Sequence, residues 1–294
     1  MNSRTCVIVN PASGRGKGRK ALPAILSAFN RLDGLSIRET RAKGDEDRLV
    51  KDALAEGFST IVAAGGDGTW SNVGRAILRE GAGTTVSLGL IAAGTGNDLA
   101  KSIGAPAEDY EATAKLVEEG KTTLIDAGRI GNDFFLNSIG FGFDASVLAT
   151  IEKMSWLRGS AVYTVAALRQ LFTYRGFSVS SPDAKLPEKP MMMIVANGGY
   201  LGGAFRIAPS ATITDGTLDT VIIADMPALD RLRLFGAAMQ GSHIGHAAVT
   251  TLRSHRITLE FAEPPSCQRD GELDHLPDRI VTLSCVHAAL KVIG

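Results

Sequence analysis

Along the first 125 or so positions, short continuous apolar runs alternate with segments whose apolar residues recur at helical spacing. Runs such as Cys6–Val9 and Thr60–Ala64 predict buried strands, whereas the spacing within Glu46–Ala55 predicts an amphipathic helix. Strands that alternate with helices favour parallel pairing and an α/β layer architecture. The expected strands cover residues 6–9, 35–39, 60–64 and 86–91, and the expected helices cover 21–29, 46–55, 69–78 and 99–103.

The pattern of apolar positions changes near Thr123, where strand-like segments begin to dominate. Turn signals such as Asn197-Gly198-Gly199 and Asp215-Gly216 separate these segments, and helical patterns interrupt them at 145–153, 160–172 and 230–239. This pattern predicts a β-rich second domain, with a β-sandwich as the expected architecture. We therefore expect an α/β domain over residues 1–124, completed by a C-terminal strand over 285–294, and a β-sandwich over residues 125–284.

Charge and cysteine content narrow the class of protein. Acidic and basic residues balance at 31 each, whereas a nucleic-acid-binding protein would normally carry a basic excess, so we expect no nucleic-acid partner. The three cysteines show no C-x-x-C spacing, which is typical of reduced thiols in a cytoplasmic protein. No apolar run approaches the roughly 20 residues of a membrane-spanning helix, so any lipid would have to be reached from the water side.

The strongest chemical signal is Gly65–Thr69, with the sequence Gly-Gly-Asp-Gly-Thr directly after an apolar strand. A strand, a glycine turn and a helix start favour phosphate binding, because glycine permits close approach and the helix N-terminus offers free N–H groups. The carboxylate of Asp67 would repel phosphate unless it binds a bridging cation or accepts a proton from the acceptor hydroxyl. The alternative is a tight turn in which Asp67 or Thr69 caps the helix. The order of the five residues favours nucleotide binding.

Two further loops follow strands of the same domain. Gly94–Asp98 repeats the glycine-rich pattern, and Asn10–Gly18 offers a hydroxyl at Ser13 and two cations. The latter is not a Walker A loop, because the G-x-x-x-x-G-K-[ST] spacing fails. Helix capping and an ordinary strand–helix turn are the respective alternatives. Since the carboxyl ends of neighbouring parallel strands meet at one edge, we expect the loops to face one crevice.

Together these loops resemble the catalytic domain of diacylglycerol kinases, a family that also holds sphingosine kinases, ceramide kinases and soluble bacterial lipid kinases. Asn10–Gly14 is similar to the family's N-terminal nucleotide loop, Gly65–Thr69 is its signature, and Gly94–Asp98 matches its G-T-x-N-D loop. Further similar segments follow in the family's order over most of the chain: Asn137–Asp144, Asn197–Gly203, Ala208-Pro209, Asp215–Asp219 and Asp270–Glu272.

The resemblance implies ATP-dependent transfer of a phosphoryl group to a lipid hydroxyl, with Mg²⁺ as cofactor and ATP as co-substrate. Diacylglycerol or a related lipid, including ceramide and sphingoid types, is the expected acceptor. We expect an N-terminal α/β nucleotide-binding domain followed by a β-sandwich, with the active site in the cleft between them. Phosphoryl transfer suits such a site, because it needs mainly in-line positioning and charge neutralisation.

The resemblance also implies roles for single residues. Glu272 would be the proton acceptor, with Asp270 beside it and Asp67 as the third catalytic carboxylate. Without the resemblance, Asp270-Gly-Glu272 would be interpreted as a solvated turn. Asp215, with main-chain oxygens near Thr212 and Thr217, would hold a structural magnesium ion. The residues expected around ATP are Asn10, Pro11, Ala12, Ser13, Gly14, Thr40, Gly65, Gly66, Asp67, Gly68, Thr69 and Thr95.

Two positions depart from the family pattern. Ser71-Asn72 stand where the family usually has Asn-Glu, and Ala92 stands where a proline is often found. The first departure removes a charge near the site and bears on activity and substrate choice. It leaves Asp67 and Glu272 in place.

The segment Arg158–Arg175 mixes arginines with aromatic and aliphatic residues. It could rim a lipid entrance, where basic side chains meet anionic headgroups, or it could be a helix that simply packs on its domain. We expect transient, peripheral contact with the membrane surface that holds the lipid substrate. The sequence leaves a homodimer open.

Two other functions stay open. NAD kinases also carry Gly-Gly-Asp-Gly, so an NAD kinase-like small-molecule kinase is one alternative, although Asp215–Asp219 and Asp270–Glu272 favour the lipid kinase. A non-catalytic lipid- or nucleotide-binding protein with the same fold is the other, and Asn72 supports it.

Overall fold

The computed structural model describes residues 4–93, 96–106, 109–153 and 169–294. Its first part alternates strands and helices, as the apolar pattern predicts. In chain order these elements are β1 (Thr5–Val9), α1 (Ser13–Phe29), β2 (Ser36–Glu39), α2 (Asp45–Ala55), β3 (Thr60–Gly65), α3 (Asp67–Arg79), β4 (Ser87–Ala92), α4 (Asp98–Ile103) and α5 (Tyr110–Glu119).

Four parallel strands of this part pair in the order β2-β1-β3-β4. The apolar residues of β1, β3 and β4 are buried on both faces, as expected when helices cover a parallel sheet. One face packs with residues of α2 and α3 such as Val50 and Ile77, and the other packs with Ile25 and Val117 of α1 and α5. The carboxyl ends of all four strands therefore lie along one edge, where the loops that follow them gather.

The second part is built mainly of antiparallel strands. Its elements are β5 (Thr122–Ile130), β6 (Asp133–Phe135), β7 (Ser138–Gly142), α6 (Phe143–Lys153), β8 (Val179–Ser180), β9 (Pro190–Ala196), β10 (Leu218–Ala224), α8 (Ala228–Gln240), β11 (Val249–Ser254), β12 (Arg256–Phe261), β13 (Ser266–Arg269), β14 (Glu272–His275) and β15 (Ile280–Ile293).

Two sheets enclose the core of this second domain. A six-stranded sheet has the order β11-β10-β9-β7-β13-β14, and residues such as Phe141 and Val195 on its inner face pack with Leu259 and Leu283 of the other sheet. Its outer face packs with α6 and α8, where Phe143 and Leu234 are buried. No helix of the described residues is long and apolar enough to cross a membrane.

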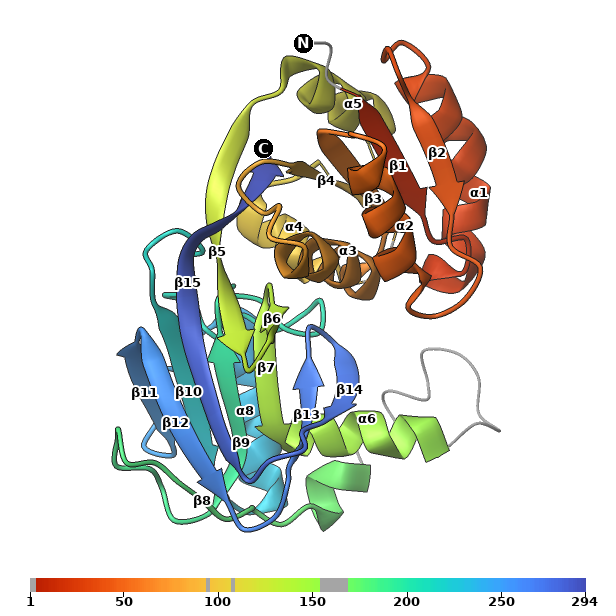
Figure 1. Cartoon of the computed structure of the whole chain (residues 1–294). Coiled ribbons are helices and arrows are strands. Elements are labelled where there is room, and N and C mark those ends of the chain that lie inside the picture. The colour runs from red at the N-terminus through yellow and green to blue at the C-terminus, as the bar shows by residue number, and fades with distance from the viewer. Residues whose placement is uncertain (1–3, 94–95, 107–108, 154–168) are drawn as a thin grey trace.

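Two strands, β5 and β15, run through both domains (Figure 1). They pair antiparallel from Leu283 opposite Ile130 to Ile293 opposite Thr122. At one end β15 also pairs with β12, and at the other its residue Lys291 pairs in parallel with β4. A single nine-stranded sheet therefore extends from the first domain into the second.

A bulge between Val286 and Leu290 interrupts the pairing of β5 and β15. The fully buried Asp126 of β5 fills the interruption: its carboxylate accepts the amide protons of Ala288 at 2.8 Å and Gly216 at 2.6 Å. Asp126 therefore ties both crossing strands to the loop that precedes β10.

The predicted fold class, an α/β domain followed by a β-sandwich, is confirmed by this architecture. The expected division between residues 124 and 125 falls inside β5. Helix α1 extends back to Ser13, with non-helical backbone at Gly14, Arg15 and Gly16. Helix α5 and the β13–β14 hairpin were not predicted, and most of the helix expected over 160–172 lies outside the described residues.

Candidate active site

The three predicted nucleotide loops meet at the carboxyl edge of the parallel strands. Asn10, after β1, donates from Nδ2 to Oγ1 of Thr69 in the first turn of α3, at 3.0 Å. Gly14 has a φ of +54°, and a Cβ atom there would lie 2.5 Å from the carbonyl oxygen of Ala93, so only glycine fits. The amide of Thr40, after β2, donates to Val9 O at 2.9 Å. The loop of Asn10–Gly14 thus lies between the ends of the neighbouring strands.

Asp67 joins the signature loop to the loop that follows β4. Its two carboxylate oxygens accept the amide protons of Asn97 at 2.7 Å and of Asp98 at 2.5 Å. Asp98 in turn accepts the amide proton of Gly203, from the second domain, at 2.9 Å. The predicted ATP-contacting residue Thr95 lies outside the described residues.

The carboxylates of Asp67 and Asp98 form an acidic pair. Burial raises the pKa of Asp67 above its usual value. Burial, followed by the negative charge of Asp67, raises the pKa of Asp98 to about 6. Close by, Asn97 Oδ1 is buried without a hydrogen-bond partner among the described residues. A bound cation would neutralise the repulsion between the two carboxylates, and it would take the free oxygen of Asn97 as a ligand.

Glu272 reaches the same place from the second domain, about 200 residues further along the chain. A Cβ atom on Gly68 would lie only 3.2 Å from Oε1 of Glu272, so the carboxylate lies against the signature loop. Its side chain is 37% exposed, and Oε2 lies 3.9 Å from Nζ of Lys43. Glu272 is thus accessible to a substrate and adjacent to the predicted phosphate site.

Asp270 occupies a different environment from Glu272. It is 5% exposed, and its carboxylate accepts the amide protons of Leu136, Asn137 and Ser138 at 2.8, 2.8 and 3.0 Å. The hydroxyl of Ser71 on α3 donates to the same carboxylate. Asp270 therefore attaches the turn between β13 and β14 to both domains. We expect it to contribute to catalysis by holding Glu272 in position.

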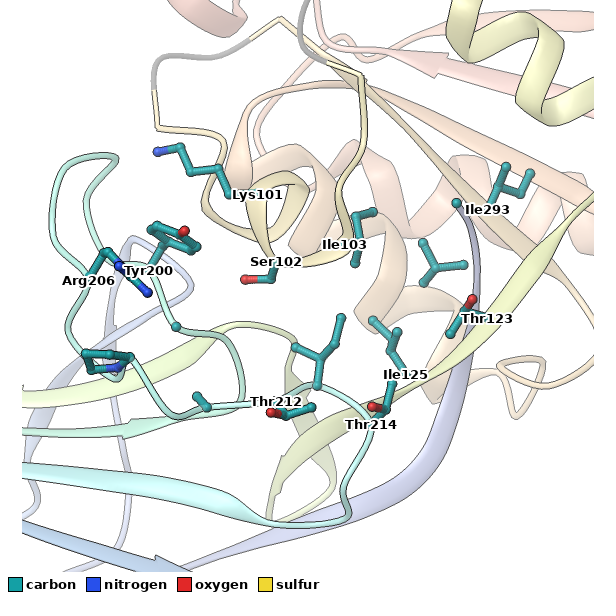
Figure 2. Close-up of a pocket in the computed structure, with 16 residues that line it drawn as sticks. Lys101, Ser102, Ile103, Thr123, Ile125, Tyr200, Arg206, Thr212, Thr214 and Ile293 are labelled. Atoms are coloured by element: carbon teal, nitrogen blue, oxygen red, sulfur yellow. The ribbon is translucent and has the colours of Figure 1, made fainter. Parts of the chain in front are cut away.

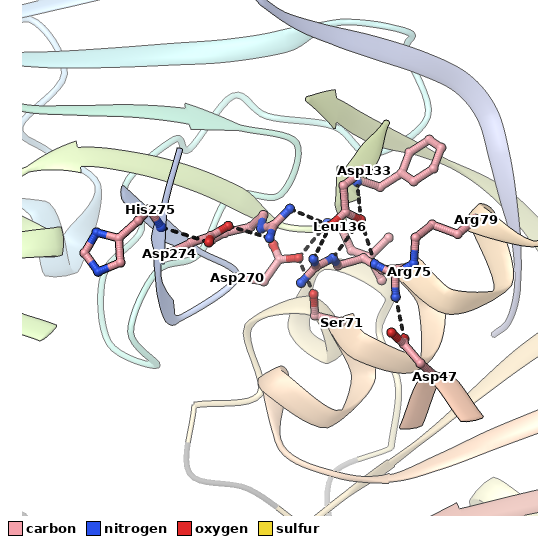
Figure 3. Close-up of polar contacts among 11 residues, drawn as sticks. Asp47, Ser71, Arg75, Arg79, Asp133, Leu136, Asp270, Asp274 and His275 are labelled. Atoms are coloured by element: carbon pink, nitrogen blue, oxygen red, sulfur yellow. Dashed lines mark hydrogen bonds and ion pairs between the residues drawn. The ribbon is translucent and has the colours of Figure 1, made fainter. Parts of the chain in front are cut away.

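An ion-pair network beside the hairpin strengthens this attachment (Figure 3). Asp133 of β6 pairs with Arg75, with Arg79 at 2.9 Å and with Arg269 at 2.8 Å. Burial alone would raise the pKa of Asp133, but Arg75 and Arg269 hold it well below its usual range. Arg79 continues the network to Asp47 of α2. Helices of the first domain and strands of the second are thus held together next to Glu272.

Lys43 and Glu46, at the start of α2, were not predicted to belong to the site. Glu46 is 3% exposed, and its Oε2 has no hydrogen-bond partner within the described residues. Burial raises the pKa of Glu46, and the charge of Glu272 adds to the effect. One sequence signal could have pointed to Glu46: acidic residues begin α2 shortly after Thr40, at the strand edge where the other loops lie.

At the predicted magnesium site of Thr212, Asp215 and Thr217, the carboxylate of Asp215 is engaged by other protein groups. Asp215 Oδ1 accepts the amide and hydroxyl protons of Thr217 at 3.0 and 2.6 Å, and Oδ2 pairs with Arg253. The described residues also contain no group of three or more His, Cys, Asp or Glu suited to a metal ion. Both oxygens of the Asp215 carboxylate thus already have partners, as do both oxygens of Asp67, whereas Asn97 Oδ1 has none among the described residues.

A cavity of about 450 Å³ lies on another side of α4, between the domains (Figure 2). Ile103, Ile125 and Ile293 give it an apolar part, and Lys101 and Arg206 lie at its other side. Its lining includes Thr212 but none of the three predicted catalytic carboxylates. The predicted nucleotide site and this cavity are therefore separate.

Comparisons with known proteins agree with this arrangement. The model of a family described as "Diacylglycerol kinase catalytic domain" matches residues 4–130, and that described as "YegS C-terminal NAD kinase beta sandwich-like domain" matches residues 137–294. A diacylglycerol kinase of Bacillus subtilis (strain 168) is 30% identical over 287 residues, 95% of this chain and 93% of that protein. A Pseudomonas aeruginosa protein named "Probable lipid kinase YegS-like" is 32% identical, over 95% of this chain and 91% of its own length.

A solved structure shows the same fold. A diacylglycerol kinase from Bacillus anthracis str. Sterne superimposes with a TM-score of 0.75 at 23% sequence identity, covering 99% of this chain and 96% of its own.

Proposed function

The chain belongs to the diacylglycerol kinase catalytic-domain family, and from this we propose that it transfers the γ-phosphoryl group of ATP to a lipid hydroxyl. Diacylglycerol or a related lipid, including ceramide and sphingoid types, is the proposed acceptor. The observation that carries the proposal is the contact between Glu272 and Gly68, which brings a half-exposed carboxylate against the nucleotide loop.

In the proposed reaction, Glu272 accepts the proton of the lipid hydroxyl. The freed oxygen bonds to the γ-phosphorus while the bond from that phosphorus to the bridging oxygen breaks, and ADP leaves with the bond's electrons. Glu272 suits this step because, among the described residues, it has one ion-pair neighbour, Lys43, at the long distance of 3.9 Å, and because it is accessible to a substrate.

The loops of Asn10–Gly14 and Gly65–Thr69 are proposed to bind the phosphates of ATP. Main-chain N–H groups at the start of α3 and the positive end of its dipole would hold their negative charge. Asp67, Asn97 and Asp98 would hold Mg²⁺, which when bound supplies neutralisation of phosphate charge.

The departure at Ser71-Asn72 is compatible with catalysis. Ser71 donates to Asp270, so this position attaches the hairpin that carries Glu272. The family glutamate is absent at Asn72, but another buried carboxyl, that of Glu46, lies close enough to Glu272 for their charges to interact. These contacts favour an active kinase over a non-catalytic binding protein.

The test is transfer of labelled phosphate from ATP to lipid alcohols in mixed micelles. Diacylglycerol, ceramide, sphingosine and NAD should be offered separately, and we expect label in a lipid. Asp67→Ala and Glu272→Ala should each lower turnover by about 10² or more, roughly 3 kcal/mol in the transition state.

Both variants should keep the wild-type circular dichroism spectrum, which separates lost chemistry from lost folding. Glu263→Ala, an exposed glutamate in the turn after β12, is the matched control and should retain full turnover. Label in NAD with none in any lipid alcohol would overturn the proposal in favour of a small-molecule kinase.

A further inference from the structure

Helix α8 presents an apolar face to solvent. Leu229, Leu232 and Met239 are 68%, 54% and 52% exposed, whereas Leu234 and Ala238 are buried against the second domain. The spacings of three and seven residues place the exposed side chains on one side of the helix. A surface helix normally turns polar residues to water, so this side is suited to a less polar neighbour.

Phe172 is a further exposed apolar residue, on a segment that is attached to the start of α8. It is 61% exposed and lies in the helical turn 169–173. The buried guanidinium of Arg231 on α8 donates to Leu171 O at 2.7 Å and to Tyr174 O at 3.1 Å. This turn is thereby fixed against the first turns of α8. We call Leu229, Leu232, Met239 and Phe172 the α8 surface.

Exposed arginines flank the α8 surface. Arg169 and Arg175 border Phe172 in sequence, and Arg206 lies at the other end, where its amide donates to Ala238 O at 3.0 Å. Within the described part of the chain, none of these three guanidinium groups takes part in an ion pair.

The two acidic residues beside the first turn of α8 are already paired. Asp225 pairs with the buried Arg231, and Asp230 pairs with Arg233 at 3.1 Å. The charge left uncompensated around the α8 surface is therefore positive. An apolar strip with a basic border matches the interface of a bilayer that contains anionic lipids.

The α8 surface is also joined to the candidate active site. Phe235 of α8 contacts Phe143 at the start of α6, with ring centroids 5.1 Å apart, and α6 packs against β13 and β14. Phe235 also contacts Phe205 at 6.1 Å, two residues after the Gly203 that binds Asp98. Lipid taken up at this surface would enter beside the elements that position Glu272 and Asp98.

We propose that the α8 surface docks on an anionic bilayer and so brings the acceptor lipid to the site, an inference that rests on the proposed function. The apolar side chains enter the boundary between headgroups and acyl chains, and the arginines bind headgroup phosphates. A twofold contact between copies of this chain would instead bring two sets of unpaired arginines together, which is unfavourable.

The test is sedimentation with vesicles of phosphatidylcholine, alone or with about one third phosphatidylglycerol. We expect the wild-type chain to bind the anionic vesicles, and less so as salt is added. The variant Leu229→Gln/Leu232→Gln/Met239→Gln should bind at least about tenfold more weakly. The control variant Leu26→Gln/Ile280→Gln alters residues that are 47% and 62% exposed elsewhere, and it should bind like the wild type.

A second pair of changes separates charge from burial. Arg169→Gln/Arg175→Gln should weaken binding to anionic vesicles while leaving the weak binding to phosphatidylcholine alone unchanged. Equal binding of the triple variant and the wild type would overturn the proposal. A wild-type dimer in analytical ultracentrifugation that the triple variant dissociates would also overturn it, because the surface would then be a subunit contact.

Catalysis is measured separately with dihexanoylglycerol, which is dissolved rather than held in a bilayer. The triple variant should phosphorylate it at the wild-type rate while losing activity on long-chain diacylglycerol in vesicles. A wild-type chain that binds vesicles but phosphorylates no lipid alcohol would refute the proposed function and leave the docking surface supported.

Discussion

Asp144 stands in the first turn of α6, and both of its carboxylate oxygens are buried without a hydrogen-bond partner in the described residues. The carboxyl group packs against Gly140 of β7, where a Cβ atom would lie 1.9 Å from Oδ2. Burial raises the pKa of Asp144 to about 7, and the amides of Ala145 and of Asp144 itself offset this only in part. The group is therefore neutral in the folded chain at mildly acidic pH.

We expect Asp144→Asn to remove a pH dependence of stability. The unfolded chain releases this proton near its ordinary pKa of about 4, whereas the folded chain releases it near 7. The free energy of unfolding of the wild type should therefore fall as pH rises between those values and level off above them. Relative to the variant, the wild type should lose roughly 2–3 kcal/mol between about pH 5 and pH 8.

Urea unfolding of both proteins at the two pH values measures this difference. Other titrating groups are shared by the two proteins and cancel in the comparison. A difference that stays constant with pH would show that Asp144 titrates normally in the folded chain.

At the scale of elements, the β13–β14 hairpin depends on Asp270 for its place. Asp270→Ala removes the acceptor of three amide protons and one hydroxyl, so it should cost about 3 kcal/mol of stability or more and also lower turnover. Ser71→Ala removes one of these bonds and should cost only about 1–2 kcal/mol. Thermal unfolding and turnover, measured on both variants, test this order.

A comparison of kcat with the KM for ATP tests whether Asp270 acts by positioning Glu272. If Asp270 acts through Glu272, Ser71→Ala should lower kcat and leave the KM for ATP unchanged, because the nucleotide loops are untouched. An Asp270→Ala protein as stable and active as the wild type would contradict the anchoring role.

The β13–β14 hairpin could not be predicted from the sequence pattern. The strands β13 and β14 have four residues each, Ser-Cys-Gln-Arg and Glu-Leu-Asp-His, too short and too polar for an apolar pattern. Their position depends on pairing with β7, more than 120 residues earlier. Resemblance to a family singled out Glu272, but its contact with Gly68 could be found only in three dimensions.

Local patterns were more informative in the first domain. The alternation of strands and helices predicted the α/β architecture, because each element there carries its own apolar periodicity. Helix α5 was overlooked although its signals are local: Asp109 caps the amide of Ala112, and Gly120 ends the helix in a left-handed conformation. The acidic pair of Asp67 and Asp98 required tertiary structure, because helix α3 and strand β4 lie between its members in the sequence.

At the scale of the whole molecule, the shared sheet predicts a single unfolding unit. Since β5 and β15 belong to both domains, neither domain can lose its strand pairing without disrupting strands of the other domain. We expect amide protons of β3 and β9 to lose protection at the same urea concentration in hydrogen exchange followed by mass spectrometry. Protection of β9 that outlasts that of β3 would show that the domains unfold separately.

The path of β15 also sets the order of events during synthesis. A ribosome makes β4 early, but the strand that pairs beside it in parallel emerges some 200 residues later, after nearly all of the second domain. Until then the nascent first domain has an exposed strand edge that can pair with other chains. In cells, chaperones should therefore have to protect this edge until β15 has been made. A fragment that ends at residue 130 lacks β15, so its β4 edge would stay exposed to pairing with other chains.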